Sequence, residues 1–133
     1  MSIIKWDKKF EVGNVEIDSE HKVFVRIIQK IIRATEIKKD HKYIERLIYE
    51  LLKYADFHFY SEETVMMEMN YPDIANHQKE HQKLLLKLKD MIAIVEVENY
   101  SRPMSDLIKF LTDWFVTHTI TVDKKLADYL ADF

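Results

Sequence analysis

Hydrophobic residues recur along most of this chain at the three- and four-residue intervals of amphipathic helices. Three of the apolar stripes follow residues that commonly start helices. The first helix is expected to begin at Asp18 or Ser19, the second at Asp40, and the third at Asp73, behind Pro72. The pattern therefore predicts an all-α chain.

Two segments remain: a fourth apolar stripe near the end of the sequence, and an N-terminal stretch in which hydrophobic residues have no regular spacing. The fourth stripe follows a predicted loop at residues 99–103, in which Ser101 is the expected helix cap. Residues 1–17 show no sustained period, so we expect an extended N-terminal arm. The residues expected to pack this arm across the helices are Trp6, Phe10 and Val12.

Composition agrees with the helical pattern. One Gly and two Pro are too few turn formers for a many-stranded β protein, and 47% hydrophobic with 32% charged residues fits an amphipathic bundle. The length fits one domain. We expect a single domain at 1–133, with the arm at 1–17, a four-helix bundle at about 18–120 and a short C-terminal turn at about 123–131.

Several classes of protein are excluded by what the sequence lacks. Without cysteine, neither disulfides nor thiolate metal sites can form. No signal-peptide core and no run of about 20 apolar residues is present, so we expect a cytoplasmic protein without a membrane span. A net charge of −3 with interspersed signs gives no electrostatic case for nucleic-acid binding.

Five of the six histidines fall on the inward stripes, spread over all four helices. A single inward histidine is usually a core residue satisfied by a hydrogen bond, but five independent cases would be improbable. Glu62 shares the stripe of His58, and a buried carboxylate without a partner is costly. The inward set is His21, His58, Glu62, His77, His81 and His118. We therefore predict a metal site, and we expect His41 to lie on the surface.

The number of donor atoms indicates two metals. The five histidines supply five nitrogens, and Glu62 and Asp123 supply four oxygens if each bridges both metals. A bridging solvent oxygen, counted at each metal, raises the total to eleven, whereas two octahedral ions need about twelve. One position remains open, at the metal that has two histidines. Imidazole with carboxylate suits iron, although manganese or zinc would also be accepted.

These residues resemble the hemerythrin family, in particular its short bacterial form, the bacteriohemerythrins. The motifs that carry the resemblance are His21, His58-Phe59-x-x-Glu62, His77-x-x-x-His81 and His118-x-x-x-x-Asp123. The segment from Trp6 to Asp18-x-x-His21 and the Asp113-Trp114 pair also match, so the resemblance covers the whole chain.

The resemblance implies an up-down-up-down antiparallel four-helix bundle around two iron ions (Fe2+/Fe3+) with an oxo or hydroxo bridge. It assigns His77, His81 and His118 to one iron, and His21 and His58 to the iron that binds dioxygen.

The resemblance also carries over the walls of a ligand pocket. Its positions are Phe24, Phe59, Trp114 and Phe115. Phe24 and Phe115 are larger than the aliphatic residues often found there, which bears on ligand access and oxygen affinity.

The implied function is reversible dioxygen binding, for oxygen carriage, storage or local supply. Di-iron oxygenases surround their metals with about four carboxylates, which stabilise high oxidation states better than two carboxylates and five imidazoles do. Apolar pocket walls also supply no acid to drive cleavage of dioxygen. We therefore expect a binding protein and not an enzyme. We further expect a monomer that accepts azide or nitric oxide as alternative ligands and delivers oxygen to a recipient protein that the sequence does not identify.

Other functions stay open at this point. Sensing of oxygen, redox state or nitric oxide would need a separate partner protein, because a single domain of this length has no room for an output module. Di-iron oxidase or peroxidase chemistry uses similar ligands. The stretch from His77 to His81 also matches the zinc-peptidase pattern H-x-x-E-H through Glu80, but a single zinc would leave four inward ligand candidates unexplained.

Overall fold

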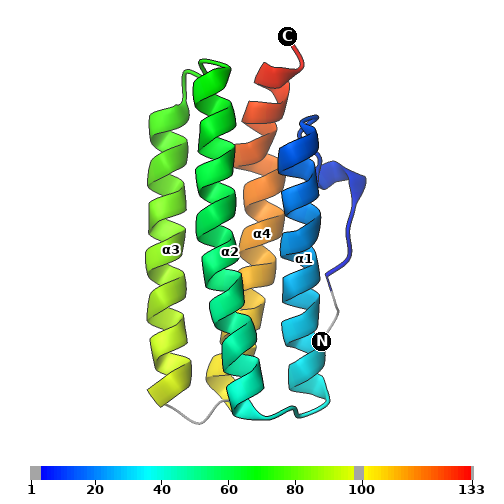
Figure 1. Cartoon of the computed structure of the whole chain (residues 1–133), viewed down its shortest axis with the longest axis vertical. Coiled ribbons are helices and arrows are strands. Elements are labelled where there is room, and N and C mark those ends of the chain that lie inside the picture. Colours follow the sequence, from blue (N-terminus) through cyan, green and yellow to red (C-terminus); the bar gives the residue numbers. More distant parts are fainter. Residues whose placement is uncertain (1–3, 98–100, 133) are drawn as a thin grey trace.

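The computed structural model describes the backbone of residues 4–97 and 101–132. Its elements are η1 (Lys8–Phe10), α1 (Val15–Glu36), α2 (His41–Glu68), α3 (Ile74–Val97) and α4 (Ser101–Leu130). Successive long helices run in opposite directions, and each packs on its neighbours around the bundle (Figure 1). This is the predicted up-down-up-down four-helix bundle. Within the described ranges, no helix combines the length and the apolar character needed to cross a membrane.

The start of α1 differs from the prediction. Asn14, not Asp18 or Ser19, caps the helix, because its side-chain oxygen accepts a first-turn backbone N–H at 3.0 Å. Asp18 lies inside the first turn, where its carboxylate accepts the N–H groups of Val12 at 2.7 Å and Gly13 at 3.2 Å. The extended arm therefore ends before residue 17, and Asp18 fastens it to the helix.

The other predicted helix starts lie close to the observed ones. Asp40 caps α2 as predicted, with its carboxylate accepting the N–H of Lys42. α3 begins at Ile74, directly after the predicted Asp73. The turn between α2 and α3 is short, and Asn70 has a φ of 55°, a left-handed conformation that asparagine tolerates better than most residues. This turn holds the two helices antiparallel.

α4 is longer than predicted at both ends. It begins at Ser101, so Ser101 belongs to the helix instead of preceding it, and Pro103 fits the first turn because its missing N–H is not needed there. Residues 99 and 100 of the predicted loop lie outside the described residues. The separate turn expected at 123–131 is wrong, since α4 continues to Leu130. No Gly or Pro follows Pro103 in the sequence to interrupt it.

The N-terminal arm packs across the bundle as predicted. Phe10 and Val12 are both buried, and the half-buried ring of Trp6 meets the ring of Phe10 edge-on at 5.6 Å between centroids. The arm is also fastened to α1, because the side-chain amide of Gln29 donates to the carbonyl oxygen of Ile4 at 2.7 Å.

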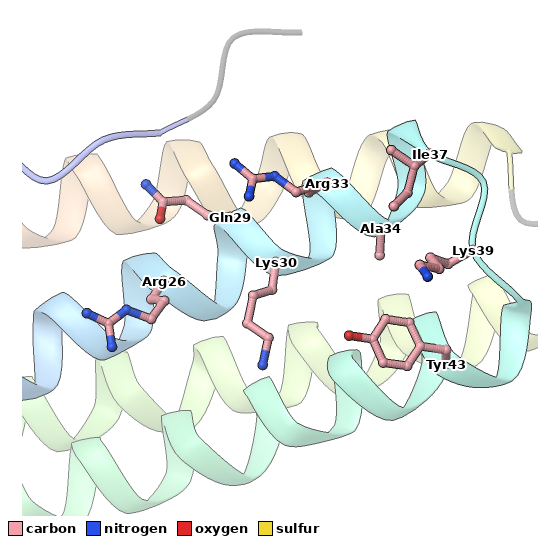
Figure 2. Close-up of a pocket in the computed structure, with 8 residues that line it drawn as sticks. All are labelled: Arg26, Gln29, Lys30, Arg33, Ala34, Ile37, Lys39 and Tyr43. Atoms are coloured by element: carbon pink, nitrogen blue, oxygen red, sulfur yellow. The ribbon is translucent and has the colours of Figure 1, made fainter.

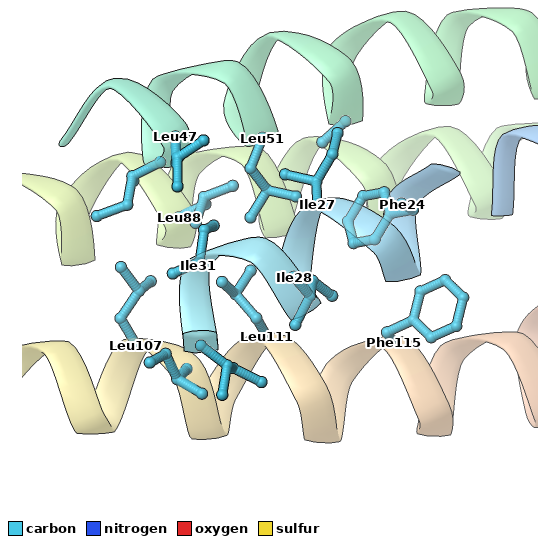
Figure 3. Close-up of a cluster of buried hydrophobic side chains, with 14 of the residues drawn as sticks. Phe24, Ile27, Ile28, Ile31, Leu47, Leu51, Leu88, Leu107, Leu111 and Phe115 are labelled. Atoms are coloured by element: carbon cyan, nitrogen blue, oxygen red, sulfur yellow. The ribbon is translucent and has the colours of Figure 1, made fainter. Parts of the chain in front are cut away.

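Two apolar clusters make up the core. The larger cluster fills most of the bundle and includes Phe24, Ile28, Leu51, Leu88, Leu111 and Phe115 (Figure 3). The smaller cluster lies towards the start of α1 and the end of α4 and consists of Val12, Ile17, Val65, Met66, Tyr71 and Leu126. On α1, α2 and α4, the histidines and carboxylates of the inward stripes lie between residues of the two clusters. The core is therefore divided by a polar layer.

Candidate metal centre

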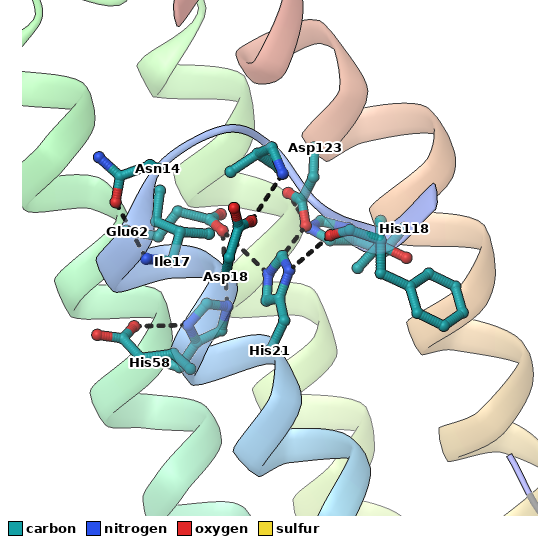
Figure 4. Close-up of polar contacts among 12 residues, drawn as sticks. Asn14, Ile17, Asp18, His21, His58, Glu62, His118 and Asp123 are labelled. Carbon is teal, nitrogen blue, oxygen red and sulfur yellow. Dashed lines mark hydrogen bonds and ion pairs between the residues drawn. The ribbon is translucent and has the colours of Figure 1, made fainter. Parts of the chain in front are cut away.

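Seven buried histidine and carboxylate side chains form this polar layer in the described part of the chain, and each is at most 5% exposed. Figure 4 labels five of them, namely His21, His58, Glu62, His118 and Asp123. They are His21 of α1, His58 and Glu62 of α2, His77 and His81 of α3, and His118 and Asp123 of α4. The structure thus brings together all of the ligand candidates that the sequence indicated. His41 is exposed at the start of α2, as expected.

Helical spacing explains why these side chains meet. Residues four apart lie one turn above each other on one face of a helix, which applies to His58 with Glu62 and to His77 with His81. The tight turn between α2 and α3 brings these two faces together. His21 of α1 and the residues His118 and Asp123 of α4 complete the layer (Figure 4).

The carboxylate of Glu62 lies between two groups of histidines. Its Oε1 atom is 3.4 Å from Nε2 of His77 and 3.2 Å from Nε2 of His81. Its Oε2 atom is 3.6 Å from Nε2 of His21 and 3.5 Å from Nε2 of His58. One carboxylate oxygen therefore faces each group.

Asp123 repeats this arrangement from α4. Its Oδ1 atom is 3.0 Å from Nε2 of His77 and 3.2 Å from Nε2 of His118, whereas its Oδ2 atom is 3.5 Å from Nε2 of His21. The two carboxylates together divide the histidines into a group of three and a group of two. The group of three is His77, His81 and His118, and the group of two is His21 and His58.

The donor atoms fit metal ions. Two sets have all their ligand atoms within 4.8 Å of one another, namely Glu62 with His77, His81 and His118, and Glu62 with His21 and His58. Five of the buried donor atoms lack a hydrogen-bond partner: both oxygens of Glu62 and the Nε2 atoms of His21, His81 and His118. Leaving such atoms unpaired in a protein interior is costly. A cation that prefers nitrogen and oxygen ligands would satisfy them.

Three outer groups orient the inner histidines, and sequence reasoning missed all three. Nδ1 of His58 lies 2.8 Å from the carboxylate atom Oε1 of Glu20, and Nδ1 of His81 lies 2.8 Å from the carboxylate atom Oε2 of Glu63. Nδ1 of His21 donates to the carbonyl oxygen of Phe10 at 3.2 Å. In each case an acceptor on Nδ1 leaves the Nε2 lone pair of the neutral ring facing the layer, which is the usual arrangement around protein metal ligands. The available signal was that Glu20 and Glu63 each adjoin a candidate ligand in the sequence.

The charges of the layer are coupled when no metal is bound. Burial opposes the charged form of His21 and His77, but contacts with Glu62 and Asp123 outweigh it and raise the pKa of both to about 9. Burial also favours neutral Glu62, yet its histidine neighbours hold its pKa well below the ordinary value. Burial and the charge of Glu62 oppose ionisation of Asp123, but His118 and His77 lower its pKa to about 2. Two buried carboxylates are therefore ionised, and metal ions would displace protons from the histidines.

Aromatic rings surround the layer on the side of the larger cluster. The rings of Phe24 and Phe115 stack, with their centroids 5.4 Å apart and their planes at 17°. The ring of Trp114 stacks on that of His118, with 4.7 Å between the centroids. These three aromatic residues line a narrow cavity between His21, His58 and His118, together with Thr119 and Asp123. The cavity is too narrow for a water molecule.

Phe59, the fourth predicted pocket residue, does not line this cavity. It stacks face to face on His81, with centroids 4.0 Å and planes 9° apart. It also meets Trp114 edge-on at 5.6 Å. Phe59 therefore stacks on the three-histidine group, although its ring also lies 5.6 Å from the ring of His58 between centroids.

Glu80 does not belong to the layer. Its side chain is 49% exposed, and it lies 3.8 Å from the ammonium group of Lys83. A general base for the zinc-peptidase pattern would have to lie beside the metal-bound water. Glu80 is therefore a surface residue, and its position does not support the zinc-peptidase pattern.

Comparison with known proteins agrees with the fold and the layer. The model of the family described as "Hemerythrin HHE cation binding domain" matches residues 12–130. The chain is 27% identical over 130 residues to a bacteriohemerythrin of Clostridium acetobutylicum, covering 92% of this chain and 98% of that protein. It is 31% identical over 130 residues to a bacteriohemerythrin of Methylococcus capsulatus, covering 93% and 94%.

Further matches come from an animal protein and from a solved structure. A myohemerythrin of Theromyzon tessulatum is 30% identical over 121 residues, covering 91% of this chain and 88% of that protein. A crystal structure of a hemerythrin point mutant superposes with a TM-score of 0.85 at 28% identity, covering 98% of this chain and 99% of that one. The family match spans the whole bundle, and so the chain belongs to the hemerythrin family.

Proposed function

We propose that this chain binds dioxygen reversibly at a non-haem di-iron centre, for carriage, storage or local supply of oxygen. The observation that carries the proposal is the division of five histidines into three and two across the same two carboxylates. An unequal division leaves one metal with fewer ligands than the other. That difference provides one open position for a small ligand.

The ligand roles follow from which atoms face one another. We propose that His77, His81 and His118 hold one iron and that His21 and His58 hold the other. Glu62 and Asp123 would bridge them, since each presents one oxygen to either group. When bound, a di-iron centre supplies two electrons and an open coordination position for dioxygen.

The surroundings of the two-histidine group favour reversible binding over further chemistry. Phe24, Trp114 and Phe115 form apolar walls that exclude water. The hydroxyl of Thr119, which also lines the cavity, already donates to the carbonyl oxygen of Phe115 at 2.7 Å. As metal ligands, Asp123 would be ionised and the histidines would be neutral, so none of them would have an acidic proton to give. No acid in the lining is therefore placed to protonate a bound ligand.

Metal content and reversible colour change test this function. Elemental analysis of purified protein should find two irons per chain. The reduced protein should be colourless without oxygen, develop a visible charge-transfer band when oxygen is added, and lose the band again under vacuum. One tightly held zinc per chain, with no iron, would contradict the di-iron proposal. A band that appears but never reverses would instead indicate oxidation chemistry.

A further inference from the structure

A positively charged groove lies between α1 and α2, close to the connection that joins them (Figure 2). It encloses about 240 Å³. Four of its eight lining residues are cationic, and none is acidic: Arg26, Lys30 and Arg33 of α1, and Lys39 of the connection. The rest of the lining is Gln29, Ala34, Ile37 and Tyr43.

The charges of this groove are not balanced locally. In the part of the chain that the structure describes, no carboxylate lies within 4.0 Å of the charged nitrogens of these four residues. By contrast, Lys109 and Lys124 on α4 each pair with an aspartate one turn away. Like charges held close together repel one another, so an unpaired group of four favours the arrival of an anion.

The imbalance extends along the sequence. Residues 22–46 carry eight Lys or Arg and only three Asp or Glu, although the whole chain has a net charge of −3. An adjoining groove between the same helices shares Arg26 and Lys30, but Glu50 lines it as well. The purely cationic lining therefore runs from Arg26, in the middle of α1, to Lys39 of the α1–α2 connection.

The chemistry of the lining points to phosphate. Guanidinium and ammonium groups bind phosphate oxygens through charge-assisted hydrogen bonds. Lys30 reaches from α1 towards α2, where the hydroxyl of Tyr43 points into the same space (Figure 2). The Tyr43 ring and the side chain of Ile37 add an apolar wall, whereas the amide of Gln29 is already engaged with the arm.

We propose that this groove binds a small organic phosphate that carries at least two negative charges. Its volume is just below the roughly 300–1,000 Å³ of pockets that hold drug-sized ligands, which suits a sugar phosphate better than a longer polymer. The mixture of cations with one aromatic and one aliphatic wall suits a phosphate ester better than inorganic phosphate alone.

The groove and the metal layer have no residue in common. The groove is lined from the second half of α1, the α1–α2 connection and the start of α2, whereas His21 lies in the first half of α1 and His58 in the second half of α2. Binding here can therefore be measured without reading the iron centre. The proposal does not depend on the proposed function, and its failure would leave that function untouched.

Calorimetric titration of the metal-loaded protein tests the proposal, with fructose 1,6-bisphosphate as the probe and fructose as the uncharged control. The wild-type protein should bind one bisphosphate per chain and no fructose. Lys30→Gln/Lys39→Gln should weaken bisphosphate binding by about tenfold or more. The matched variant Lys79→Gln/Lys89→Gln removes the same charge from exposed positions on α3 and should change the affinity less than about twofold. Circular dichroism verifies that both variants fold.

The outcomes separate the groove from general charge attraction. Absence of bisphosphate binding, or equal losses in the two double variants, would overturn the proposal. Vesicles of phosphatidylcholine with phosphatidylglycerol test whether a lipid headgroup supplies the phosphate. Groove-dependent vesicle binding alongside bisphosphate binding would support the shared phosphate chemistry, with a lipid as one source. Groove-dependent binding of an RNA oligonucleotide without bisphosphate binding would overturn the small-molecule proposal.

Discussion

Glu20 on α1 holds His58 on α2 through a hydrogen bond of 2.8 Å between Oε1 and Nδ1. The other carboxylate oxygen of Glu20 accepts a hydrogen bond from Ser61 at 2.7 Å. The backbone carbonyl of Glu20 accepts another from the hydroxyl of Tyr54 at 3.1 Å. One residue thus fixes the ring of a proposed iron ligand from a neighbouring helix.

Glu20→Gln should weaken iron binding by about 10–100-fold, the usual cost of removing a group that orients a metal ligand. Gln keeps the shape but can no longer supply the negative charge opposite Nδ1 of His58. Competition with a chelator measures the loss. Glu80→Gln makes the same change at an exposed position and should leave iron retention unaltered. Equal retention in the two variants would show that Glu20 does not position the ligand.

Glu62→Gln should abolish stable binding of both irons, because Glu62 contacts both histidine groups and Gln cannot bridge as an anion. Elemental analysis of the folded variant measures this, with His41→Ala as the control for an exposed histidine outside the layer. A Glu62→Gln protein that retained two irons would mean that Glu62 is not a bridge. Iron loss in His41→Ala would mean that His41 also contributes to iron binding.

The stability of the metal-free chain should depend on pH in a defined direction. The pKa of His21 and of His77 rises from 6.5 to about 9 on folding, so their stabilisation is fully present below pH 6.5 and is lost as pH rises towards 9. The pKa of Asp123 falls from 3.8 to about 2, so its stabilisation is present above pH 3.8 and is lost as pH falls towards 2. The pKa of Glu62 is also held well below its ordinary 4.5, so its stabilisation is present above pH 4.5. The free energy of unfolding should therefore be greatest between about pH 4.5 and 6.5.

Urea denaturation with a chelator present, measured at several pH values, follows this dependence. The metal-loaded protein is the comparison, and its stability should not fall between pH 6.5 and 9, because coordinated histidines have already lost their protons. A metal-free chain that gained stability over that interval would contradict the assigned shifts.

Phe115→Leu should speed the entry of small ligands. Phe115 is 2% exposed, lines the cavity, and contacts the rings of Phe24 and His21. Shortening it should accelerate azide binding to the ferric protein and also accelerate loss of the oxygenated form, since water gains access. Stopped-flow mixing measures both rates. The substitution should cost about 1–3 kcal/mol of stability, so measurements belong well below the melting transition.

Phe59→Leu is the matched control, because Phe59 is equally buried but stacks on His81 outside the cavity. It should change the azide rate much less than Phe115→Leu does. Equal acceleration in the two variants would mean that entry depends on general loosening of the core. Unchanged rates in Phe115→Leu would assign the entry route to other residues.

Periodicity in the sequence predicted the elements of this fold better than their ends. Asn14 and Asp18 both suit the cap of α1, and only the contact of Asp18 with the arm shows why Asn14 takes that role. The apolar stripe of α4 is regular only as far as the ligand region around Asp123, which is why the pattern predicts a helix end there, whereas α4 continues to Leu130. A helix without Gly or Pro has no local signal to stop there.

The inner residues of the layer were predictable because they sit on apolar stripes, where charge is unusual. The outer residues were not. Glu20 and Glu63 are 14% and 20% exposed, and carboxylates on the edge of a helix face are common without any role. Phe59 directly follows His58, but the rotation of 100° per residue turns it away from the cavity and onto His81. Such assignments depend on which neighbouring helix faces each side chain, and that is a tertiary property.

The polar layer separates the larger apolar cluster from the smaller one, so the two ends of the bundle should differ in their stability against local unfolding. Among the described residues, the smaller cluster beyond it holds six that are buried and apolar. The hydroxyl of Tyr129 ties the end of α4 to the carbonyl oxygens of Met69 and Asn70. So small a cluster stabilises that end weakly by itself. When metal is removed, we expect the end containing Tyr71 and Leu126 to open as a local unfolding unit while the larger cluster stays folded. Amide hydrogen exchange would then be fast at one end of a bundle that still looks fully helical.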